Sequence, residues 1–573
     1  MNNNTKKLEN TLKLYLRNNN LKELKSLLDN ISDKRSYLYL YYIGLYYLQL
    51  NKHHDAIIKF KEAYNTDTTS FLPLYNISTA YIRAFKYQEC IDYFNNYKNI
   101  VKDDALLLSN IALCFQNLNN NDEALKYYLQ SIQIEPDNEN INYNYAVFLY
   151  ANEDIDQAVS ILKTLYDKNP NILIGLNLSK YLSQQKNYLL SLKIAKELFV
   201  NNLNNLDVLI NYSEILRINK KYEDAINLLL DNPTQIDSFA YYFELAKAYY
   251  DNNDLKNANI NYNKCLSIDS DNHIVLRDLA ILSAKQSQFD ASLKYCLRVL
   301  KNYPDNENIH QLLIENLYKI GNFDNFLKES IKFEKKYPYN QINNALRTLL
   351  SYDHNITNPS LFCSSPFDNI KVYKFKDSDK KLDLLQGLKK LAYDMNIIDD
   401  PNKVATIKGL HTDFTVFDNQ NKYSMELEKF IHSCISDYKS SYANQNDKLI
   451  TDWPADFFIN GWCVILRKGG YEAPHIHPNA WLSGCFYIDM PQKVINNEGN
   501  IEFIPYGYDI PNKNSNLPCY SYKPEIGSCI LFPSSLFHYT VPFNGKNDRI
   551  SLAFDIIPVT WYEFIPKETY KTY

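Results

Sequence analysis

The chain has 573 residues, of which 45% are hydrophobic and 22% are charged, and its formal net charge is −5. This composition is typical of a soluble globular protein with two or more domains, and it excludes a disordered chain. The slight negative charge gives no electrostatic reason to bind nucleic acid or an acidic membrane surface, so we expect neither partner.

The start of the chain and the cysteine pattern indicate the cellular compartment. "MNNNTKKLEN" has no apolar run after its lysines, so no secretory signal is expected. The longest uncharged apolar stretch of the first half, residues 37–50, is shorter than the ~20 residues that a membrane helix needs. The ten cysteines form no CxxC pair, which argues against a disulfide framework or a zinc ribbon. We therefore expect a cytoplasmic protein.

Two regions of different composition meet near residue 341. Only three of the thirteen glycines, Gly44, Gly175 and Gly321, precede this point. All four tryptophans and fifteen of the twenty-one prolines follow it. A segment almost free of Gly and Pro predicts helices, whereas short apolar runs between Gly- and Pro-containing turns predict β-strands.

The helical region repeats with a period of 34 residues. In residues 37–70 the small Gly44 is followed twelve positions later by Ala56, and small residues recur at both positions in other copies. Small residues let two antiparallel helices approach closely, while large residues at helical spacing fill the seam. The pattern resembles the tetratricopeptide repeat (TPR). The copies are residues 37–70, 71–104, 105–138, 139–172, 173–205, 206–238, 239–272, 273–306 and 307–340.

Hairpins of this kind bury their apolar faces only against their neighbours. We therefore expect a TPR solenoid of about nine repeats over residues 37–340, with a groove that binds a peptide or protein partner. Residues 1–36 are expected to form N-terminal helices, which can be a degenerate first repeat. Residues 341–365 are expected to hold a capping helix, around 343–354, and a linker.

The second region, residues 366–573, mixes two amphipathic helices with short β-like runs. The runs are separated by turns that carry Gly, Pro or Asn, and their spacing suggests a barrel or a two-sheet jelly roll. The helices are expected at 381–397 and 424–442, and the strands at 369–375, 457–468, 482–489, 499–505, 527–534 and 549–558.

Two histidines in "EAPHIHPNAW" are candidate metal ligands. His475 and His477 are two residues apart, so in a strand both side chains point to the same side. A third histidine, His538, ends "CILFPSSLFH". Arg549 follows it by eleven residues and opens the last strand, with Ser551 on the same face.

This order of residues resembles the iron(II)/2-oxoglutarate oxygenases. The resemblance is strongest over residues 460–556, in "HIHPNAWLSG" and "LFPSSLFHYTVPFNGKNDRIS", and it is closest to a group of oxygenases found mainly in bacteria and phages. It implies a multidomain protein in which an all-α TPR solenoid precedes an α+β double-stranded β-helix (jelly-roll) domain. It also implies Fe(II) as the metal and 2-oxoglutarate as the cosubstrate.

The resemblance implies that His475 and His538 are metal ligands, with His477 as the third. The wider superfamily usually has a carboxylate at the position of His477, so the third ligand is open. His477 can bind the metal itself, or it can lie behind the ligands while a carboxylate or water completes the set. The nearest acids in sequence are Glu472 and Asp489.

The cosubstrate residues follow from the same resemblance. Arg549 suits the distal carboxylate of 2-oxoglutarate, because a planar guanidinium pairs with a carboxylate through two hydrogen bonds. Ser551 offers a hydroxyl donor, and Tyr487 is either a second donor or an ordinary core residue. Asn460 and Trp462 share a strand face and are weaker candidates for the pocket wall; His411 is expected to be structural or to touch substrate.

These features together predict a non-haem Fe(II)/2-oxoglutarate-dependent dioxygenase. The fusion suggests that it hydroxylates a peptide or protein-borne substrate presented by the TPR groove, although a small-molecule substrate is compatible with the same sequence. The alternative is a TPR protein-interaction scaffold with a cupin-like or vestigial metal-binding domain. A nucleic-acid demethylase is disfavoured because the sequence shows no basic stripe.

Overall fold

The computed structural model describes residues 3–97, 102–232, 238–356, 360–376, 378–397, 405–418, 421–508, 510–512, 514 and 516–562. The chain divides into two compact units, residues 1–268 and 269–573. Within the described ranges no helix has the length and apolar character needed to cross a membrane. The division falls inside the helical region, so the last helical hairpins belong to the same compact unit as the β-strands.

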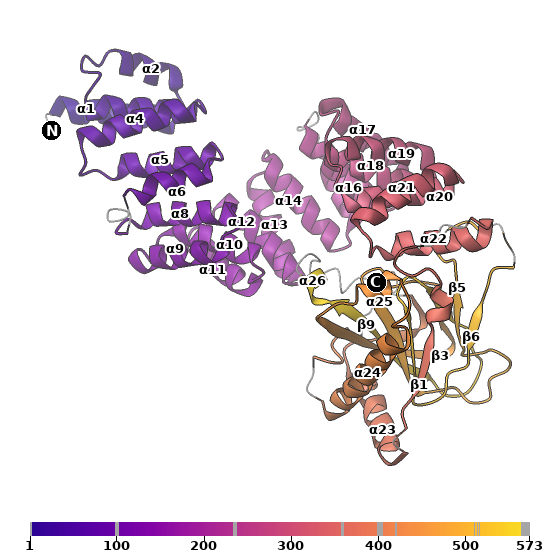
Figure 1. Ribbon diagram of the computed structural model, residues 1–573. Helices are drawn as coiled ribbons and strands as arrows, with labels where there is room; N and C mark the ends of the chain where they lie inside the picture. Colours follow the sequence, from indigo (N-terminus) through magenta and orange to yellow (C-terminus); the bar gives the residue numbers. More distant parts are fainter. Residues whose placement is uncertain are drawn as a thin grey trace. The chain divides into compact units, whose positions relative to one another are not determined.

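The first unit is a series of helical hairpins, drawn from indigo to magenta in Figure 1. Its helices are α1 (Asn3–Arg17), α2 (Leu21–Asp29), α3 (Tyr37–Gln49), α4 (His53–Thr66), α5 (Leu72–Arg83), α6 (Tyr87–Asn95), α8 (Ala105–Asn117), α9 (Asn121–Ile134), α10 (Glu139–Ala151), α11 (Ile155–Lys168), α12 (Ile172–Gln184), α13 (Tyr188–Asn201), α14 (Leu206–Ile218), α15 (Tyr222–Leu230), α16 (Phe239–Asp251) and α17 (Leu255–Ile268).

The small residues of the repeat lie where the paired helices touch. Ala56, Ala124 and Ala158 are fully buried. At Gly44 an added Cβ would lie 2.6 Å from the ring of Phe60, so a larger residue would push the two helices of that hairpin apart.

The turn inside each hairpin uses a residue in the left-handed region of backbone space. Asn is favoured there because its short polar side chain tolerates positive φ better than most residues do. These positions recur every 33 or 34 residues, which is the expected period. They are Asn51, Phe85, Asn119, Glu153, Lys186, Lys220, Asn253, Ser287 and Gly321.

The second unit begins with two further hairpins and a closing helix. The helices are α18 (His273–Lys285), α19 (Phe289–Asn302), α20 (Glu307–Lys319), α21 (Phe323–Lys336) and α22 (Gln341–His354). In Figure 1, α22 lies between these hairpins and the strands. Nine of the fourteen residues of α22 are buried, which is more than a helix with a single apolar face would bury. Both sides of α22 are therefore covered within this unit.

Two antiparallel sheets follow α22. The larger sheet has the strand order β1-β7-β4-β9-β3-β2, and the smaller one has the order β6-β5-β8. The strands are β1 (Lys371–Lys374), β2 (Thr406–His411), β3 (Phe457–Glu472), β4 (Leu482–Asp489), β5 (Ile501–Ile504), β6 (Tyr520–Tyr522), β7 (Ser528–Pro533), β8 (Phe537–Thr540) and β9 (Arg549–Pro558), and the helices are α23 (Ser378–Asp394), α24 (Lys422–Ser441), α25 (Lys448–Thr451), α26 (Val559–Tyr562) and the 3-10 helix η2 (Pro366–Asn369).

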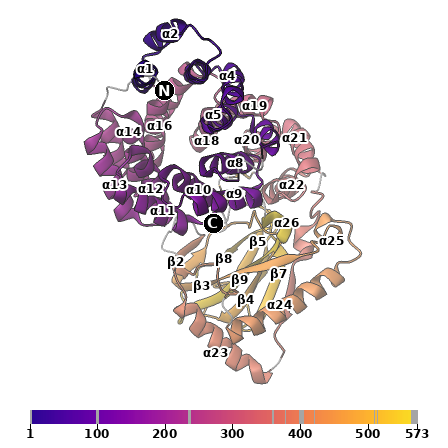
Figure 2. The ribbon, with the colours of Figure 1, turned by 90° about the vertical axis from the view of Figure 1, so that its left-hand side faces the viewer.

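The two faces of the larger sheet have different roles. On one face Ile550, Leu552 and Phe554 of β9 pack against apolar residues of α23 and α24 in a fully buried core. Figures 1 and 2 show both helices along that side of the strands. The opposite face packs on the smaller sheet, where Phe503 of β5 and Phe532 of β7 have ring centroids 4.9 Å apart. Successive residues of β9 therefore point alternately into the core beneath the helices and into the space between the two sheets.

The predicted fold class, a TPR solenoid followed by a domain with antiparallel sheets, is confirmed. Two kinds of detail differ from the prediction. The strands β6 and β8 lie in segments where no strand was predicted. His475 and His477 lie after the end of β3 and not inside a strand. Pro474 and Pro478 flank them, and proline has no N–H to donate to a sheet ladder. β2, which carries His411 at its end, was not predicted as a strand.

Candidate metal centre

Backbone pairing brings the three histidines to one place. His475 and His538 form an isolated antiparallel bridge, in which each N–H donates to the carbonyl oxygen of the other, at 3.1 and 3.0 Å. The His477 N–H donates to the carbonyl oxygen of Ser534 at 3.0 Å. The segment after β3 is thus attached to β8 and to the turn before it, although the chain places them far apart.

The three rings converge. Their centroids are 4.3 Å apart for His475 and His538, 5.2 Å for His475 and His477, and 5.1 Å for His477 and His538. One ring nitrogen from each lies within 4.8 Å of the other two. Within the described part of the chain, this group of potential ligands contains no carboxylate.

Hydrogen bonds fix which nitrogen of each ring faces the centre. The Nδ1 atoms of His475 and His538 lie 2.7 and 3.1 Å from the carbonyl oxygens of Ala473 and Leu536. Nδ1 of His477 lies 2.7 Å from a carboxylate oxygen of Asp555. Carbonyl and carboxylate oxygens only accept, so each Nδ1 carries a hydrogen, and in the neutral form of each ring Nε2 then has a free lone pair. The buried Nε2 of His477 has no hydrogen-bond partner among the described residues. Three such nitrogens fit a metal ion.

Burial favours the neutral rings that a metal requires. It lowers the pKa of His475, and it lowers the pKa of His538 well below the ordinary value, with the neighbouring histidines adding to the effect. Neutral imidazole is the form that binds metals, so these rings need not lose a proton near neutral pH.

Asp555 is a site residue that the sequence analysis missed. Besides the contact with His477, its Oδ1 accepts a hydrogen bond from Ser483 Oγ at 2.7 Å. It lies on the same face of β9 as Arg549 and Ser551, because the three are separated by even numbers of residues. This even spacing along the predicted last strand could have identified Asp555 as a candidate from the sequence. A carboxylate behind a histidine fixes the orientation of the ring and increases its basicity as a ligand.

Arg549 is a buried cation that has no acidic partner in the described part of the chain. Its side chain is 2% exposed, and no carboxylate of a described residue lies within ion-pair distance of it. Its Nε donates to the carbonyl oxygen of Gly499 at 3.2 Å, and an Nη donates to Ser551 Oγ at 3.3 Å. A buried charge is costly unless it is paired, so this guanidinium is a candidate site for an anionic ligand.

Tyr487 lies beside that guanidinium. The centroid of the Tyr487 ring is 5.1 Å from Cζ of the Arg549 guanidinium, and Tyr487 lies directly opposite Ser551 in the sheet. Its buried hydroxyl has no nitrogen or oxygen partner among the described residues, and the thiol of Cys485 is its polar neighbour. Burial raises the pKa of this phenol well above its usual value, which keeps the proton available for donation.

A single pocket contains most of these groups. Its cavity has a volume of about 40 Å³ and is partly open to solvent. Its lining includes the three histidines, Arg549, Ser551, Glu472 and Trp462; Tyr487 and Asn460 are not among the lining residues.

The remaining candidates have other partners. Glu472 accepts a hydrogen bond from Thr406 Oγ1, and Asp489 pairs with Lys389 at 2.6 Å, so each acid has a contact of its own. His411 is buried, and its ring is stacked on Trp462, which in turn is stacked on His477. His411 therefore supports the pocket wall from behind.

Comparisons with known protein families agree with the two-part organisation. Residues 460–555 match the family model described as "Putative 2OG-Fe(II) oxygenase". Residues 2–170 and 239–272 match models of the tetratricopeptide repeat. The predicted fusion of TPR repeats with a domain of this oxygenase family is confirmed.

Solved structures with similarity to the chain include several TPR proteins. A chain of the APC/C hetero-tetramer Cut9-Hcn1 is 15% identical with a TM-score of 0.39, over 52% of this chain and 59% of that chain. A TPR protein from Parabacteroides merdae is 14% identical with a TM-score of 0.35, over 48% and 97%. The C-terminal part of a TPR protein from Cytophaga hutchinsonii is 14% identical with a TM-score of 0.30, over 42% and 99%. A search of curated proteins finds no match.

Proposed function

We propose that the chain is a non-haem Fe(II)/2-oxoglutarate-dependent dioxygenase that hydroxylates its substrate. The observation that carries this proposal is the presence, in one pocket, of three convergent imidazoles and a buried guanidinium that has no acidic partner among the described residues. A metal ion and a dicarboxylate are the ligands that would satisfy both at once. The family match to residues 460–555 supports the same chemistry.

His475, His477 and His538 would hold the metal through Nε2. Two backbone carbonyls and the Asp555 carboxylate hold their rings in place from behind. Three neutral imidazoles leave the site more positive than two imidazoles and a carboxylate would, and this favours an anionic cosubstrate. Fe(II), when bound, supplies the activation of O2 by which such enzymes hydroxylate a C–H bond while 2-oxoglutarate is converted to succinate and CO2.

Arg549 would bind the distal carboxylate of 2-oxoglutarate. The arginine is already fixed by Gly499 and Ser551, so little side-chain entropy is lost when the carboxylate binds. Ser551 lines the pocket and is available as a further donor to the same carboxylate, and Tyr487, which lies beside the guanidinium but outside the pocket lining, is a second candidate donor. Trp462 and Phe532 line the pocket and would limit the access of water to the reacting atoms.

The substrate that we propose is a peptide or a protein-borne side chain bound by the TPR groove. TPR arrays offer long binding surfaces, and the fused repeats would raise the effective concentration of a bound segment near the oxygenase domain. The ten cysteines are free and nine of them are buried, which supports the proposal of a reducing, cytoplasmic compartment. The two facing antiparallel sheets support a jelly-roll architecture for the domain.

The absence of a carboxylate among the clustered ligands of the described residues favours one alternative. A cupin-like protein with three histidines could hold a metal without using 2-oxoglutarate, and the TPR array would then act as a scaffold. Such a protein has no need of Arg549, so that residue distinguishes the two functions.

The test is an anaerobic titration of the full chain with Fe(II) and 2-oxoglutarate, followed by the metal-to-ligand absorption band that a chelated 2-oxo acid produces. We expect a band in the wild type, its loss in His475→Ala, and weaker 2-oxoglutarate binding in Arg549→Gln. Arg467→Gln, which changes an exposed arginine on β3, is the matched control and should behave as the wild type does. A wild type that binds Fe(II) but gives no band would favour the cupin-like alternative.

A further inference from the structure

The side chains between and beside the histidines face the closing helix of the repeats. Ile476, which separates His475 from His477, is 3% exposed, and Phe537, which precedes His538, is 1% exposed. Both belong to one buried apolar cluster with Ala345 of α22 and Ile504 of β5. The backbone that carries the three imidazoles therefore rests on a helix that belongs to the solenoid by sequence.

The other end of the histidine segment is held in the same way. Trp481 is fully buried, and its ring centroid is 5.0 Å from that of Tyr339, which lies between α21 and α22. The Tyr339 hydroxyl donates to Asp452 at 3.0 Å, and the Trp481 indole N–H donates to the carbonyl oxygen of Leu449 at 3.0 Å. The segment from His475 to Trp481 is thus in contact with the end of the solenoid at Ile476, between the histidines, and at Trp481, after them.

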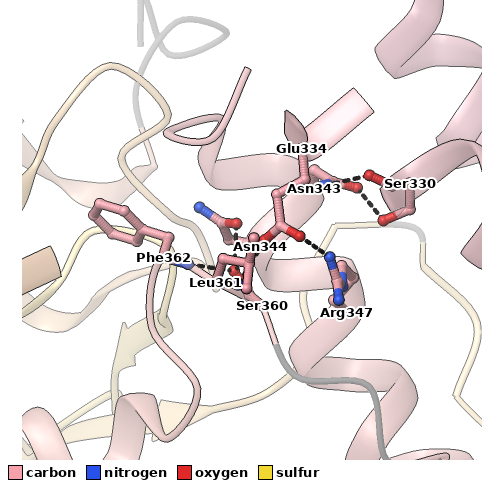
Figure 3. Close-up of polar contacts among 8 residues, drawn as sticks. All are labelled: Ser330, Glu334, Asn343, Asn344, Arg347, Ser360, Leu361 and Phe362. Atoms are coloured by element: carbon pink, nitrogen blue, oxygen red, sulfur yellow. Dashed lines mark hydrogen bonds and ion pairs between the residues drawn. The ribbon is translucent and has the colours of Figure 1, made fainter. Parts of the chain in front are cut away.

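A buried polar network fixes α22 in place, as Figure 3 shows. Glu334 of α21 and Arg347 of α22 form an ion pair in which each side chain is 2% exposed. Glu334 also accepts hydrogen bonds from Ser360 Oγ and from the Leu361 N–H, at 3.2 and 2.6 Å. The single hydroxyl hydrogen of Ser360 is shared with Asn344, whose Oδ1 lies 2.6 Å from Ser360 Oγ. One carboxylate therefore joins the last repeat, the closing helix and the chain that leads into the sheets.

The same network extends to the histidine segment. The N–H groups of Lys448 and Leu449 donate to the carbonyl oxygens of Leu361 and Phe362, at 2.9 and 2.8 Å. Leu449 is the residue whose carbonyl oxygen holds Trp481. A displacement of α22 would reach the histidines by two routes, through the apolar cluster and through this backbone ladder, because packed interiors transmit strain.

We propose that α22 is a positioning element of the metal centre, so that the affinity for the metal depends on the seating of the solenoid's closing helix. This inference rests on the proposed function, because it takes His475, His477 and His538 as the ligands. Ala345 and Tyr339 are positioning residues in this account and do not touch the metal. A partner that binds the last hairpins and shifts α22 would therefore change the affinity for the metal. By thermodynamic linkage, the metal would change the affinity for that partner by the same factor.

The experiment measures Co(II) affinity in the full chain by competition with a coloured chelator, together with the visible spectrum of the bound Co(II). Ala345→Leu overfills the cluster behind His475, His477 and His538, and we expect a loss of affinity of about 10-fold or more, as for residues that orient ligands, with a changed Co(II) spectrum. Ala280→Leu is the matched control, because Ala280 is a fully buried alanine of α18 outside this cluster. It should lower the stability but leave the affinity within about 2-fold.

A compensating variant separates positioning from general damage. The double variant Ala345→Leu, Ile476→Ala restores space in the cluster. We expect the double variant to bind Co(II) more tightly than Ala345→Leu alone. A general loss of stability does not produce such coupling between two substitutions. Circular dichroism and thermal unfolding verify folding, and Ala345→Val is the milder variant that decides the matter if Ala345→Leu does not fold. Wild-type binding with unchanged affinity in the Ala345 variants would overturn this inference alone. A wild type that binds no Co(II) would overturn the proposed function and this inference with it.

Discussion

The helical region and the β pocket bury arginine in opposite ways. In the helices, Arg217 lies 3.1 Å from both Glu244 and Asp251, and Arg347 pairs with Glu334. In the pocket, Arg549 is as deeply buried as Arg347, but among the described residues it donates hydrogen bonds only to a carbonyl and a hydroxyl. The paired arginines hold helices together, whereas the unpaired one retains its binding capacity for a ligand.

Among the described residues, buried polar atoms without a hydrogen-bond partner occur in both regions, for example at Asn261 and Tyr318 in the helices. In the β domain they include Nε2 of His477, which lines the pocket, and the hydroxyl of Tyr487, which has no nitrogen or oxygen partner and lies beside Arg549. Buried polar atoms are normally satisfied, and each exception needs an explanation. At this site the proposed metal and cosubstrate are the groups that would supply the missing partners.

The largest expected effect is the loss of the metal when one imidazole is removed. His538→Ala deletes a ring that burial keeps neutral and whose Nδ1 is held by a carbonyl. We expect no stoichiometric Co(II) or Fe(II) after anaerobic loading and desalting, measured by elemental analysis. His432→Ala, an exposed histidine of α24, should keep the metal content of the wild type. Equal metal content in both variants would contradict the ligand assignment.

The next prediction compares two arginine substitutions. Arg347→Met leaves the Glu334 carboxylate buried and unpaired, so the free energy of unfolding should fall by about 3–5 kcal/mol. Arg549→Met removes an unpaired buried charge, so the metal-free protein should be unchanged or more stable in the same urea titration. A large loss of stability in Arg549→Met would show that this arginine has a structural partner.

A smaller effect is expected at Asp555. Asp555→Asn keeps an oxygen that can accept from His477 Nδ1 but removes the charge, so the Co(II) affinity should fall by about 10-fold. Asp489→Asn, in which the substituted acid pairs with Lys389, is the matched control. If the two variants bind Co(II) alike, Asp555 does not support the metal centre.

The smallest prediction concerns pH in the last repeat. Burial lowers the pKa of His310, although Glu329 lies 3.2 Å from its Nε2. In the unfolded chain the His310 imidazole binds a proton near pH 6.5, whereas in the folded chain it does so only at lower pH. The free energy of unfolding should therefore decrease as the pH falls below about 6.5, by at most about 1.4 kcal/mol per pH unit. In His310→Gln the slope of the unfolding free energy against pH should be shallower by that amount, and an unchanged slope would contradict the assigned direction.

The sequence was sufficient for the features that depend on local period. Small residues every 34 positions predict the hairpins, and the even spacing of Arg549 and Ser551 places them on one strand face. His475 and His477 could be grouped because residues two apart in an extended segment point to the same side. Asp555 obeys the same rule on β9 and could have been found by extending it.

Features that depend on distant contacts could not be predicted. Nothing near Ala345 indicates that it shares a cluster with Ile476 and Phe537, because the three are far apart in the chain and each is an ordinary apolar residue. The Glu334–Arg347 pair fits the usual pattern of surface charges on helices, and only the packing of both sides of α22 makes it buried. One sequence also could not decide whether a carboxylate joins the histidines, since that depends on which acids already have partners.

The most direct test of the central claim, that the partner of Arg549 is a ligand carboxylate, compares two 2-oxo acids by anaerobic calorimetry on the Co(II)-loaded chain. 2-Oxopentanoate has the length of 2-oxoglutarate but a methyl group in place of the distal carboxylate. We predict that the wild type binds 2-oxoglutarate at least about 30-fold more tightly than 2-oxopentanoate, and that Arg549→Met removes this preference. Equal affinities for both acids in the wild type would contradict the account.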